Sequence, residues 1–381
     1  KAKGTTLGAD NGIGVAACMA ILTSTDIPHG PLEVLITSTE ETGMDGANGL
    51  KAGMLKGEIL LNLDSETEGE LYVGCAGGID STIQFKYKEE NVPADSKAYR
   101  IGVKGLKGGH SGMDINLGRG NSNKLLFRFL KTYTKDLGLR MASISGGTLR
   151  NAIPRESFAV VILPAANTAR LEAALKEAEA IYKAELGAKE PNLQLIAENT
   201  GMPAFVIDTC TQFRLINSIL ACPNGAVRMI DSMPDTVETS NNLAIVQSEN
   251  GKIFIKTLLR SSVETAKEAL AQSIQAVFEL ADADEISFDG AYPGWKPNPD
   301  SAILHEMQHV YEKLYGKKPA IMAIHAGLEC GLLGSKYPNW DMISFGPTLC
   351  SPHSPDERAN IPSVAKFWEY LKATLKDIPR K

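Results

Sequence analysis

The sequence predicts an α/β protein in which a mostly parallel sheet carries helices on both faces and a separate α+β domain is inserted into the chain. Two observations support this fold class. Apolar runs with strand and helix periodicity alternate over residues 8–77 and again near the carboxyl end, which is the pattern of a parallel α/β sheet. The segment between these regions has a different texture, and 381 residues exceed the size at which a single core usually keeps growing.

The two ends of the chain are expected to share one sheet. The amino-terminal part predicts a helix, a strand, a helix and a strand, over residues 10–25, 32–39, 47–55 and 58–64. The carboxyl-terminal part predicts a helix, a short strand and a closing helix, over residues 301–316, 341–346 and 363–378. We therefore assign residues 1–78 and 292–381 to one domain and residues 79–291 to the inserted domain.

The inserted domain shows nearly the same order of elements twice. Its first half predicts strand, helix, strand, strand, helix and strand, over residues 96–106, 121–136, 141–147, 156–164, 169–186 and 192–200. Its second half predicts helix, strand, strand, helix and strand, over residues 209–222, 226–232, 252–262, 266–281 and 285–292. The segments RNAIP (150–154) and SNNLA (240–244) fall at corresponding points. This doubled βαββαβ layout predicts two ferredoxin-like halves.

Charge and cysteine content limit the class of protein. Lys and Arg number 39 against 45 Asp and Glu, a net charge of −6 that argues against nucleic acid as a partner. The 6 cysteines are scattered, with no C-x-x-C pair, in a chain too large to need disulfides, which predicts a reducing, cytoplasmic setting. No apolar run of about 18 residues occurs, so we expect no membrane partner.

Several potential metal ligands follow strand-like runs or precede a helix. They are Asp10 in GADNG, Glu41 in STEETGM, Asp64 in NLDSE and His353 in SPHSPDE. Open α/β sheets place their chemistry outside the carboxyl ends of the strands, where ligands far apart in sequence meet. Zinc takes carboxylate oxygen and imidazole nitrogen, and paired ions need a bridging carboxylate. The set therefore predicts a two-metal hydrolytic site with Asp10 as the bridge.

Each of these ligands has a simpler alternative. Asp10 precedes a helix and would serve as its N-cap. Asp64 closes a strand and would be a turn or cap residue. His353 lies between two prolines that fix the backbone, which favours a ligand, although a lone surface histidine is the other interpretation. Their shared placement at strand ends favours the metal site.

Glu40 and Glu41 are adjacent carboxylates after the apolar run VLIT. They repel each other unless a cation or a shared proton relieves the charge. One of them would ligate a metal, while Glu40 would take a proton from the attacking water. The alternative is a solvated acidic turn, but the apolar run before the pair and Gly43 after it favour a buried strand that leads into a tight loop.

Further candidates would contact a substrate. His110 lies among glycines in KGGHSGMD, which permit close approach of the backbone, and is a candidate oxyanion stabiliser. Asn151, in LRNAIP, and Arg260, at the end of IFIKTLLR, would donate to a substrate carboxylate or to the oxyanion. Glu329, in IHAGLECG, would receive a substrate ammonium. The alternatives are a loop histidine, a turn residue, a strand-end salt bridge and a structural carboxylate.

With GADNG, STEETGM, NLDSE, GGHSGMD, RNAIP, IHAGLECG and GPTLCSPHSPDER in this order, the chain resembles the bacterial aminoacyl-histidine dipeptidases over essentially its whole length. These enzymes belong to the M20 clan of metallopeptidases. The resemblance implies a zinc-exopeptidase domain with an inserted lid and two zinc ions; cobalt and manganese accept overlapping ligands and are the alternative metals. It also implies specific roles: Asp10 as the bridge, Glu41 and His353 on one ion, Asp64 on the other, Glu40 as general base, and His110, Asn151 and Arg260 as lid residues that contact the dipeptide.

The chain departs from this family in one respect. Family members carry a His-x-Asp motif upstream of the bridging aspartate, and no histidine precedes Asp10. Because the chain begins at Lys1, we expect its amino-terminal part, with that motif, to be missing. The resemblance implies hydrolysis of unblocked dipeptides, including Xaa-His substrates like carnosine. The alternatives are an M20-type deacylase or tripeptidase, and an inactive truncated scaffold. A homodimer is left open.

Overall fold

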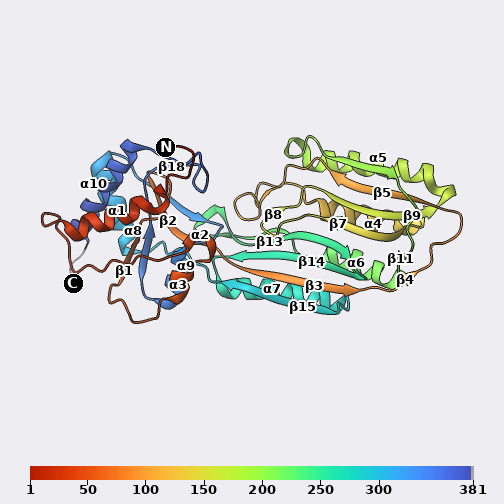
Figure 1. The fold of residues 1–381 in the computed structure, drawn as a ribbon, viewed down its shortest axis with the longest axis horizontal. Coiled ribbons are helices and arrows are strands. Elements are labelled where there is room, and N and C mark those ends of the chain that lie inside the picture. Colours follow the sequence, from red (N-terminus) through yellow and green to blue (C-terminus); the bar gives the residue numbers. More distant parts are fainter. Residues whose placement is uncertain (379–381) are drawn as a thin grey trace. The chain divides into compact units, whose positions relative to one another are not determined.

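The computed structural model describes residues 1–378, which fold into two compact units (Figure 1). The first unit comprises Lys1–Ala76 and the chain from Pro293 onward, and the second comprises Gly77–Tyr292. The sequence places the corresponding breaks after residue 78 and before residue 292. Each unit has its own sheet and its own buried apolar side chains.

The first unit is built on a four-stranded sheet in the order β1 (Ile59–Asn62), β17 (Asp341–Ser344), β2 (Glu70–Cys75) and β16 (Ala320–Ile324). β1 runs parallel to β17, and β16 runs parallel to β2. β17 and β2 meet antiparallel at one pair of residues, Ser344 and Tyr72. The prediction of a mostly parallel sheet, shared by the two ends of the chain, is confirmed.

Helices pack on both faces of this sheet. On one face lie α8 (Ala302–Tyr315) and α10 (Ile361–Asp377), where the ring of Phe345 lies 5.5 Å from that of Phe367 and 5.4 Å from that of Tyr370. On the other face lies α9 (Glu329–Lys336), where Met342 joins Cys75 and Cys330 in a separate apolar cluster. Because successive residues of a strand point to opposite faces, the central strands β17 and β2 are buried on both faces, whereas the edge strands β1 and β16 are partly exposed.

The remaining elements of the first unit carry the loops that matter for the site. α1 (Ala9–Thr23) and the short helices α2 (Glu40–Gly43) and α3 (Asp45–Gly49) lie in the amino-terminal part. β18 (Leu349–Cys350) pairs with β19 (Arg358–Ala359), so the segment between them is closed into a hairpin loop. α1, α8 and α10 fall where the apolar periodicity of the sequence predicts helices.

Two predictions in the first unit are wrong. Residues 32–39 form no strand: Leu32 and Ile36 are 37% and 57% exposed, and no described strand pairs with the segment. An alternating pattern becomes a strand only when a neighbouring backbone accepts its hydrogen bonds. The predicted helix 47–55 is reduced to α3, because Leu50 is extended and Gly53 takes a left-handed conformation. β2, β16 and α9 were not predicted.

The second unit holds one nine-stranded sheet, and its first half is ferredoxin-like. Strand, helix, strand, strand, helix and strand follow in sequence as predicted, and the four strands are antiparallel in the order β10-β5-β9-β7. This half consists of β5 (Ser96–Lys104), α4 (Ser122–Leu137), β7 (Arg140–Gly146), β9 (Ser157–Pro164), α5 (Thr168–Leu186) and β10 (Gln194–Asn199).

The second half has the same strand order, but its first strand was not predicted and precedes the whole first half in the chain. It consists of β3 (Gly77–Lys86), α6 (Thr209–Ala221), β13 (Met233–Glu249), β14 (Lys252–Ser261), α7 (Glu264–Leu280) and β15 (Glu285–Tyr292). Its four strands lie in the order β13-β14-β3-β15, so the whole first half is inserted between β3 and α6. The predicted strand 226–232 is β12 (Gly225–Ile230), an extra strand that pairs with β13.

The two halves join edge to edge through β7 and β13, which pair at Gly146–Val246 and Ser145–Gln247. A single apolar cluster extends through both halves, with Phe127 of α4 and Leu215 of α6 fully buried. Shorter strands pair within the loops: β4 (Glu89–Glu90) with β11 (Val206–Ile207), and β6 (Gly109–His110) with β8 (Ala152–Ile153).

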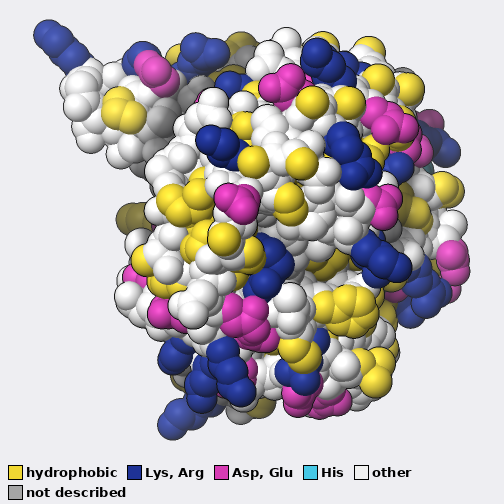
Figure 2. Space-filling view, turned by 90° about the vertical axis from the view of Figure 1, so that its right-hand side faces the viewer, with side chains coloured by type: hydrophobic (Ala, Val, Ile, Leu, Met, Phe, Trp, Pro, Cys, Tyr) yellow, Lys and Arg dark blue, Asp and Glu magenta, His cyan; other side chains and the backbone are white. Residues whose placement is uncertain are grey.

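Two further observations concern the surface. On the face drawn in Figure 2, basic and acidic side chains are interspersed with apolar ones rather than gathered by sign. Within residues 1–378, no helix combines the length and the apolar character needed to cross a bilayer.

Candidate functional site

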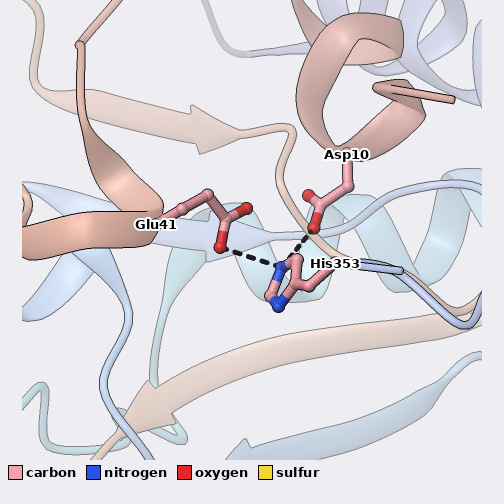
Figure 3. A group of neighbouring side chains, drawn as sticks. All are labelled: Asp10, Glu41 and His353. Carbon is pink, nitrogen blue, oxygen red and sulfur yellow. Dashed lines mark hydrogen bonds and ion pairs between the residues drawn. The ribbon is translucent and has the colours of Figure 1, made fainter. Parts of the chain in front are cut away.

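Three of the predicted ligands meet in the first unit. The Nε2 atom of His353 lies 2.9 Å from Oδ2 of Asp10 and 2.8 Å from Oε2 of Glu41 (Figure 3). One possible ligand atom from each of the three residues lies within 4.8 Å of the other two. The residues come from the start of α1, from α2 and from the loop between β18 and β19. We call these residues the triad.

Local backbone structure places Glu40 and Glu41 at a sharp turn. Thr39 takes a left-handed conformation with φ 59°, and its carbonyl oxygen accepts hydrogen bonds from the N–H groups that follow, including that of Met44 at 2.8 Å. The turn closes where Gly46 donates to the Ser38 carbonyl oxygen at 3.0 Å. A Cβ atom on Gly46 would lie 2.4 Å from the Ser38 nitrogen, so this close approach requires glycine.

Asp64 follows the end of β1, and its backbone is held by Asn62 of β1, which also bonds to Ser344 of β17. The side-chain oxygen of Asn62 accepts from the Asp64 N–H at 3.2 Å and from the Ser344 hydroxyl at 2.6 Å. Burial, followed by the charges of Glu40, Asp10, Glu329 and Glu41 in that order, raises the pKa of Asp64 to about 8. Asp64 is outside the triad, but it lies in the same electrostatic environment.

Glu40 lies beside the triad without joining it. Burial, followed by the charges of Glu41, Glu329 and Asp10, raises the pKa of Glu40 to about 7 against the opposing charge of His353. A carboxyl group with a pKa near neutrality can both accept and return a proton at physiological pH. This is the property expected of a general base that later acts as an acid.

Glu329, the first residue of α9, is a buried carboxylate that borders this region. One of its oxygens accepts from the Thr37 hydroxyl at 2.9 Å, and the other, Oε1, has no hydrogen-bond partner among the described residues. The side chain is 7% exposed, and burial raises its pKa. A buried carboxylate oxygen without a hydrogen bond is costly unless a ligand donates a hydrogen bond to it or a cation binds it.

The donor set fits a divalent cation. Burial lowers the pKa of His353, but the carboxylates of Glu41 and Asp10 outweigh burial and raise that pKa overall. The positive charge of the protonated imidazole thus reduces the repulsion among the clustered carboxylates. Zinc would supply positive charge with the same oxygen and nitrogen atoms as ligands.

The three predicted substrate residues of the second unit also lie together. The β6–β8 pairing sets His110 opposite Ala152, and the Ser111 N–H donates to the Asn151 carbonyl oxygen at 2.8 Å. The Nε–H of Arg260 is directed to the Ser111 hydroxyl at 3.4 Å. Arg260 is 5% exposed and also donates to the Tyr292 hydroxyl at 2.9 Å.

Arg260 and His110 are arranged as hydrogen-bond donors. Among the described residues, the Arg260 guanidinium donates to two neutral hydroxyls, those of Ser111 and Tyr292, and forms no ion pair with a carboxylate. The Nδ1 atom of His110 accepts N–H groups from Gly112 at 3.2 Å and Met113 at 3.1 Å. Burial lowers the pKa of His110, as does the charge of Arg260. The neutral ring therefore carries its proton on Nε2 and can donate from that atom.

Some residues of the site carried no prediction. Glu66 lies two positions after Asp64, and burial followed by the charge of Asp10 raises its pKa. Glu357 accepts backbone N–H groups from Gly8 and Asp10. Both are acidic residues inside motifs that point to the site, NLDSE and SPHSPDE, which is the one signal that could have found them.

Comparisons with known proteins identify the family. The profile of the peptidase dimerisation domain matches residues 101–190. The cytosol non-specific dipeptidase of Escherichia coli (strain K12) is 45% identical over 381 residues, which cover 100% of this chain and 78% of that protein. The crystal structure of the aminoacylhistidine dipeptidase from Vibrio alginolyticus matches with a TM-score of 0.97 and 50% identity, over 100% of this chain and 78% of that one.

A more distant structure shares the fold. The aminopeptidase PepT from Bacillus cereus matches with a TM-score of 0.50 and 14% identity, over 98% of this chain and 72% of that one. The matches to the two dipeptidases cover the whole chain and therefore every segment from which the site is built. The chain belongs to the aminoacylhistidine dipeptidase family of M20 metallopeptidases.

Proposed function

We propose that this chain hydrolyses unblocked dipeptides, including Xaa-His dipeptides of the carnosine type. The observation that carries this proposal is the convergence of Asp10, Glu41 and His353, with Glu40 beside them at a pKa of about 7. The names of the two similar proteins, a non-specific dipeptidase and an aminoacylhistidine dipeptidase, support the substrate class.

The proposed metal is zinc, although cobalt and manganese accept the same donors. Glu41 and His353 would hold one ion, Asp64 would hold a second, and the carboxylate of Asp10 would bridge them. The bound metal would lower the pKa of water and polarise the scissile carbonyl. Four carboxylates with raised pKa values, those of Glu40, Glu41, Asp64 and Glu329, support a site that needs added positive charge.

Glu40 is the proposed general base. It takes a proton from the attacking water and returns that proton to the leaving amine. Its carboxylate is held one residue before a ligand on the same short helix, which keeps it near the metal without occupying a coordination position. A base placed in this way contributes about 10²- to 10⁴-fold to the rate.

The second unit is proposed as the lid, with donors for the rest of the substrate. The Nε2–H of His110 would stabilise the oxyanion, and the guanidinium of Arg260, with the side chain of Asn151, would bind the substrate carboxylate. Support comes from the tautomer of His110 and from the neutral partners of Arg260. Glu329 in the first unit is proposed to receive the substrate ammonium, which its unpartnered oxygen favours.

Two further features are proposals of the same kind. The chain is expected to act in the cytoplasm, as the name of the Escherichia coli protein indicates for that protein. A homodimer is expected from the match to the peptidase dimerisation domain.

Substrate preference tests the proposal. The zinc-loaded chain is assayed with Xaa-His dipeptides, with other free-amine dipeptides and with N-acetyl amino acids, each with and without a chelator. We expect chelator-sensitive hydrolysis of the free-amine dipeptides. A preference for the acetylated series would identify a deacylase instead, and hydrolysis that survives complete metal removal would exclude the metal mechanism.

A further inference from the structure

We propose that Glu357 is a positioning residue that fixes the start of α1 and thereby sets the metal affinity of the Asp10–His353 pair. The inference rests on the proposed function only in taking these two residues as ligands. Glu357 would touch neither metal nor substrate. It would act through Asp10.

Glu357 bonds to the backbone on both sides of Ala9. Its Oε2 accepts from the Gly8 N–H at 2.7 Å, and its Oε1 accepts from the Asp10 N–H at 3.0 Å. The residue is 2% exposed, so water competes little for these bonds. A charged acceptor shared by two N–H groups is a strong constraint on the backbone that carries them.

α1 has no local cap for these two N–H groups. Gly8, in a left-handed conformation with φ 73°, precedes the helix and has no side chain to cap it. Asn11 accepts from the Gly14 N–H at 3.1 Å, but this cap serves the helix after Asp10 and leaves the Gly8 and Asp10 N–H groups to Glu357. The first N–H groups of a helix lack partners inside the helix, so another acceptor must satisfy them. Here the acceptor is a carboxylate 347 residues along the chain from Asp10.

Glu357 shares a hairpin loop with the other ligand. β18 and β19 pair at Leu349–Ala359 and Cys350–Arg358 and close the loop that contains both His353 and Glu357. Within this loop, the Glu357 N–H donates to the Ser354 carbonyl oxygen at 3.1 Å. The loop therefore contributes a ligand and also holds the backbone of a second ligand in register with it.

This arrangement preorganises the site. If the start of α1 moved freely, binding of a metal would have to order Asp10, and that ordering would oppose binding. Loss of a residue that orients a metal ligand weakens metal binding by about 10- to 100-fold. We expect an effect of this size when the Glu357 carboxylate is replaced.

The test is zinc titration of the metal-free chain by isothermal calorimetry, with Glu357→Gln against wild type. The glutamine keeps the size of the side chain but replaces one acceptor oxygen with an NH₂ group that cannot accept. We expect zinc affinity about 10- to 100-fold weaker, with the stoichiometry unchanged. Wild-type affinity in this variant would overturn the proposal.

The chain offers a matched control in the second unit. Glu190 is 1% exposed and likewise accepts two backbone N–H groups, from Lys107 at 2.8 Å and from Gly120 at 2.9 Å. Glu190→Gln should lower the melting temperature but leave zinc affinity unchanged. If both variants lost zinc affinity equally, the effect would be general destabilisation and the proposal would be wrong.

Two more variants keep the outcome decisive. Glu357→Asp retains the charge and both acceptor oxygens on a shorter side chain, so its zinc affinity should lie between those of Glu357→Gln and the wild type. This holds even if Glu357→Gln folds poorly. An aspartate variant with wild-type zinc affinity at a lower melting temperature would overturn the proposal, because the altered contact would then affect stability alone. His353→Ala tests the ligand assignment itself. If zinc affinity survived His353→Ala, the proposed function would fail, whereas a loss only in His353→Ala and not in the Glu357 variants would refute the positioning role alone.

Discussion

His353 and Asp10 are 343 residues apart in sequence, yet the Nε2 atom of one lies 2.9 Å from a carboxylate oxygen of the other. The same nitrogen lies 2.8 Å from Glu41. Two carboxylates converge on one imidazole, and the charges of Asp64, Glu40 and Glu329 act on the same region. The site concentrates negative charge that the protein's own residues only partly balance.

Replacement of His353 by alanine should remove the one nitrogen donor of the triad. Loss of a residue that only orients a metal ligand weakens metal binding by about 10- to 100-fold. A ligand itself contributes more, so we expect zinc affinity to fall by at least about 100-fold. Calorimetry and metal analysis after dialysis would measure the loss. His305→Ala, an exposed histidine on α8, is the control and should bind zinc as the wild type does. Equal zinc content in both variants would contradict the assignment.

Glu40→Gln should separate catalysis from metal binding. The amide has the same shape but cannot take a proton, so we expect kcat to fall by about 10²- to 10⁴-fold. Zinc content should stay close to that of the wild type because Glu40 is outside the triad. Steady-state kinetics with a free-amine dipeptide, together with metal analysis of the same sample, would check both halves. Turnover within a few-fold of the wild type would exclude Glu40 as the base.

Stability of the metal-free protein should fall as pH rises from about 4 to about 8. The ordinary pKa of an aspartate is 3.8, and burial with neighbouring carboxylates raises the pKa of Asp64 to about 8. Between these values the folded state retains a proton that the unfolded state releases, so the free energy of unfolding decreases with pH. Glu40, with a pKa raised to about 7, acts in the same direction.

Urea unfolding at several pH values, with a chelator present, would measure this slope. Asp64→Asn should flatten it, because the amide does not titrate. Added zinc should also flatten it, because the cation compensates the ionised carboxylates. If the stability of the metal-free protein rose over this pH range, the pKa values of these carboxylates would not be raised in the folded state.

The convergence of Asp10, Glu41 and His353 could be expected from the sequence because strand ends of an α/β sheet gather at one edge, although the strand expected before Glu41 does not form. Asp64 follows β1, and His353 lies in a loop beyond the parallel strand β17. Asp10 lies at the start of a helix, as its flanking residues indicate. Glu357 could not be predicted in its role. Its partners are backbone N–H groups 347 and 349 residues away, and backbone groups leave no signature in the side-chain pattern.

The errors in the fold have a common cause, which is that partners cannot be read from one segment alone. Residues 32–39 have the pattern of a strand, but no described strand lies beside them. β3 was missed as the first strand of the second half because the whole first half separates it from α6. β13 was missed because its sequence is polar, although Asn241 and Asn242 are fully buried and donate to backbone oxygens.

The junction of the two ferredoxin-like halves gives a test of the architecture itself. Gly147 follows β7 with φ 72°, and a Cβ atom there would lie 1.8 Å from the carbonyl oxygen of Ala244 on β13. Gly251, in the turn between β13 and β14, has a similar φ of 75°, but a Cβ there would meet nothing within 4 Å. The two glycines have similar positive φ values and differ in the space around a Cβ atom.

The left-handed conformation would destabilise alanine at either position by roughly 1–2 kcal/mol. Gly147→Ala adds a backbone clash that only movement of β7 away from β13 relieves, so its free energy of unfolding should fall by more than about 4 kcal/mol, in the range of exceptional substitutions. Gly251→Ala should lose no more than the strain. Urea unfolding would measure both, and zinc affinity should be unchanged in each because both glycines lie in the second unit. Equal losses at the two positions would mean that the close contact of the halves at Gly147 does not contribute to holding the sheet together.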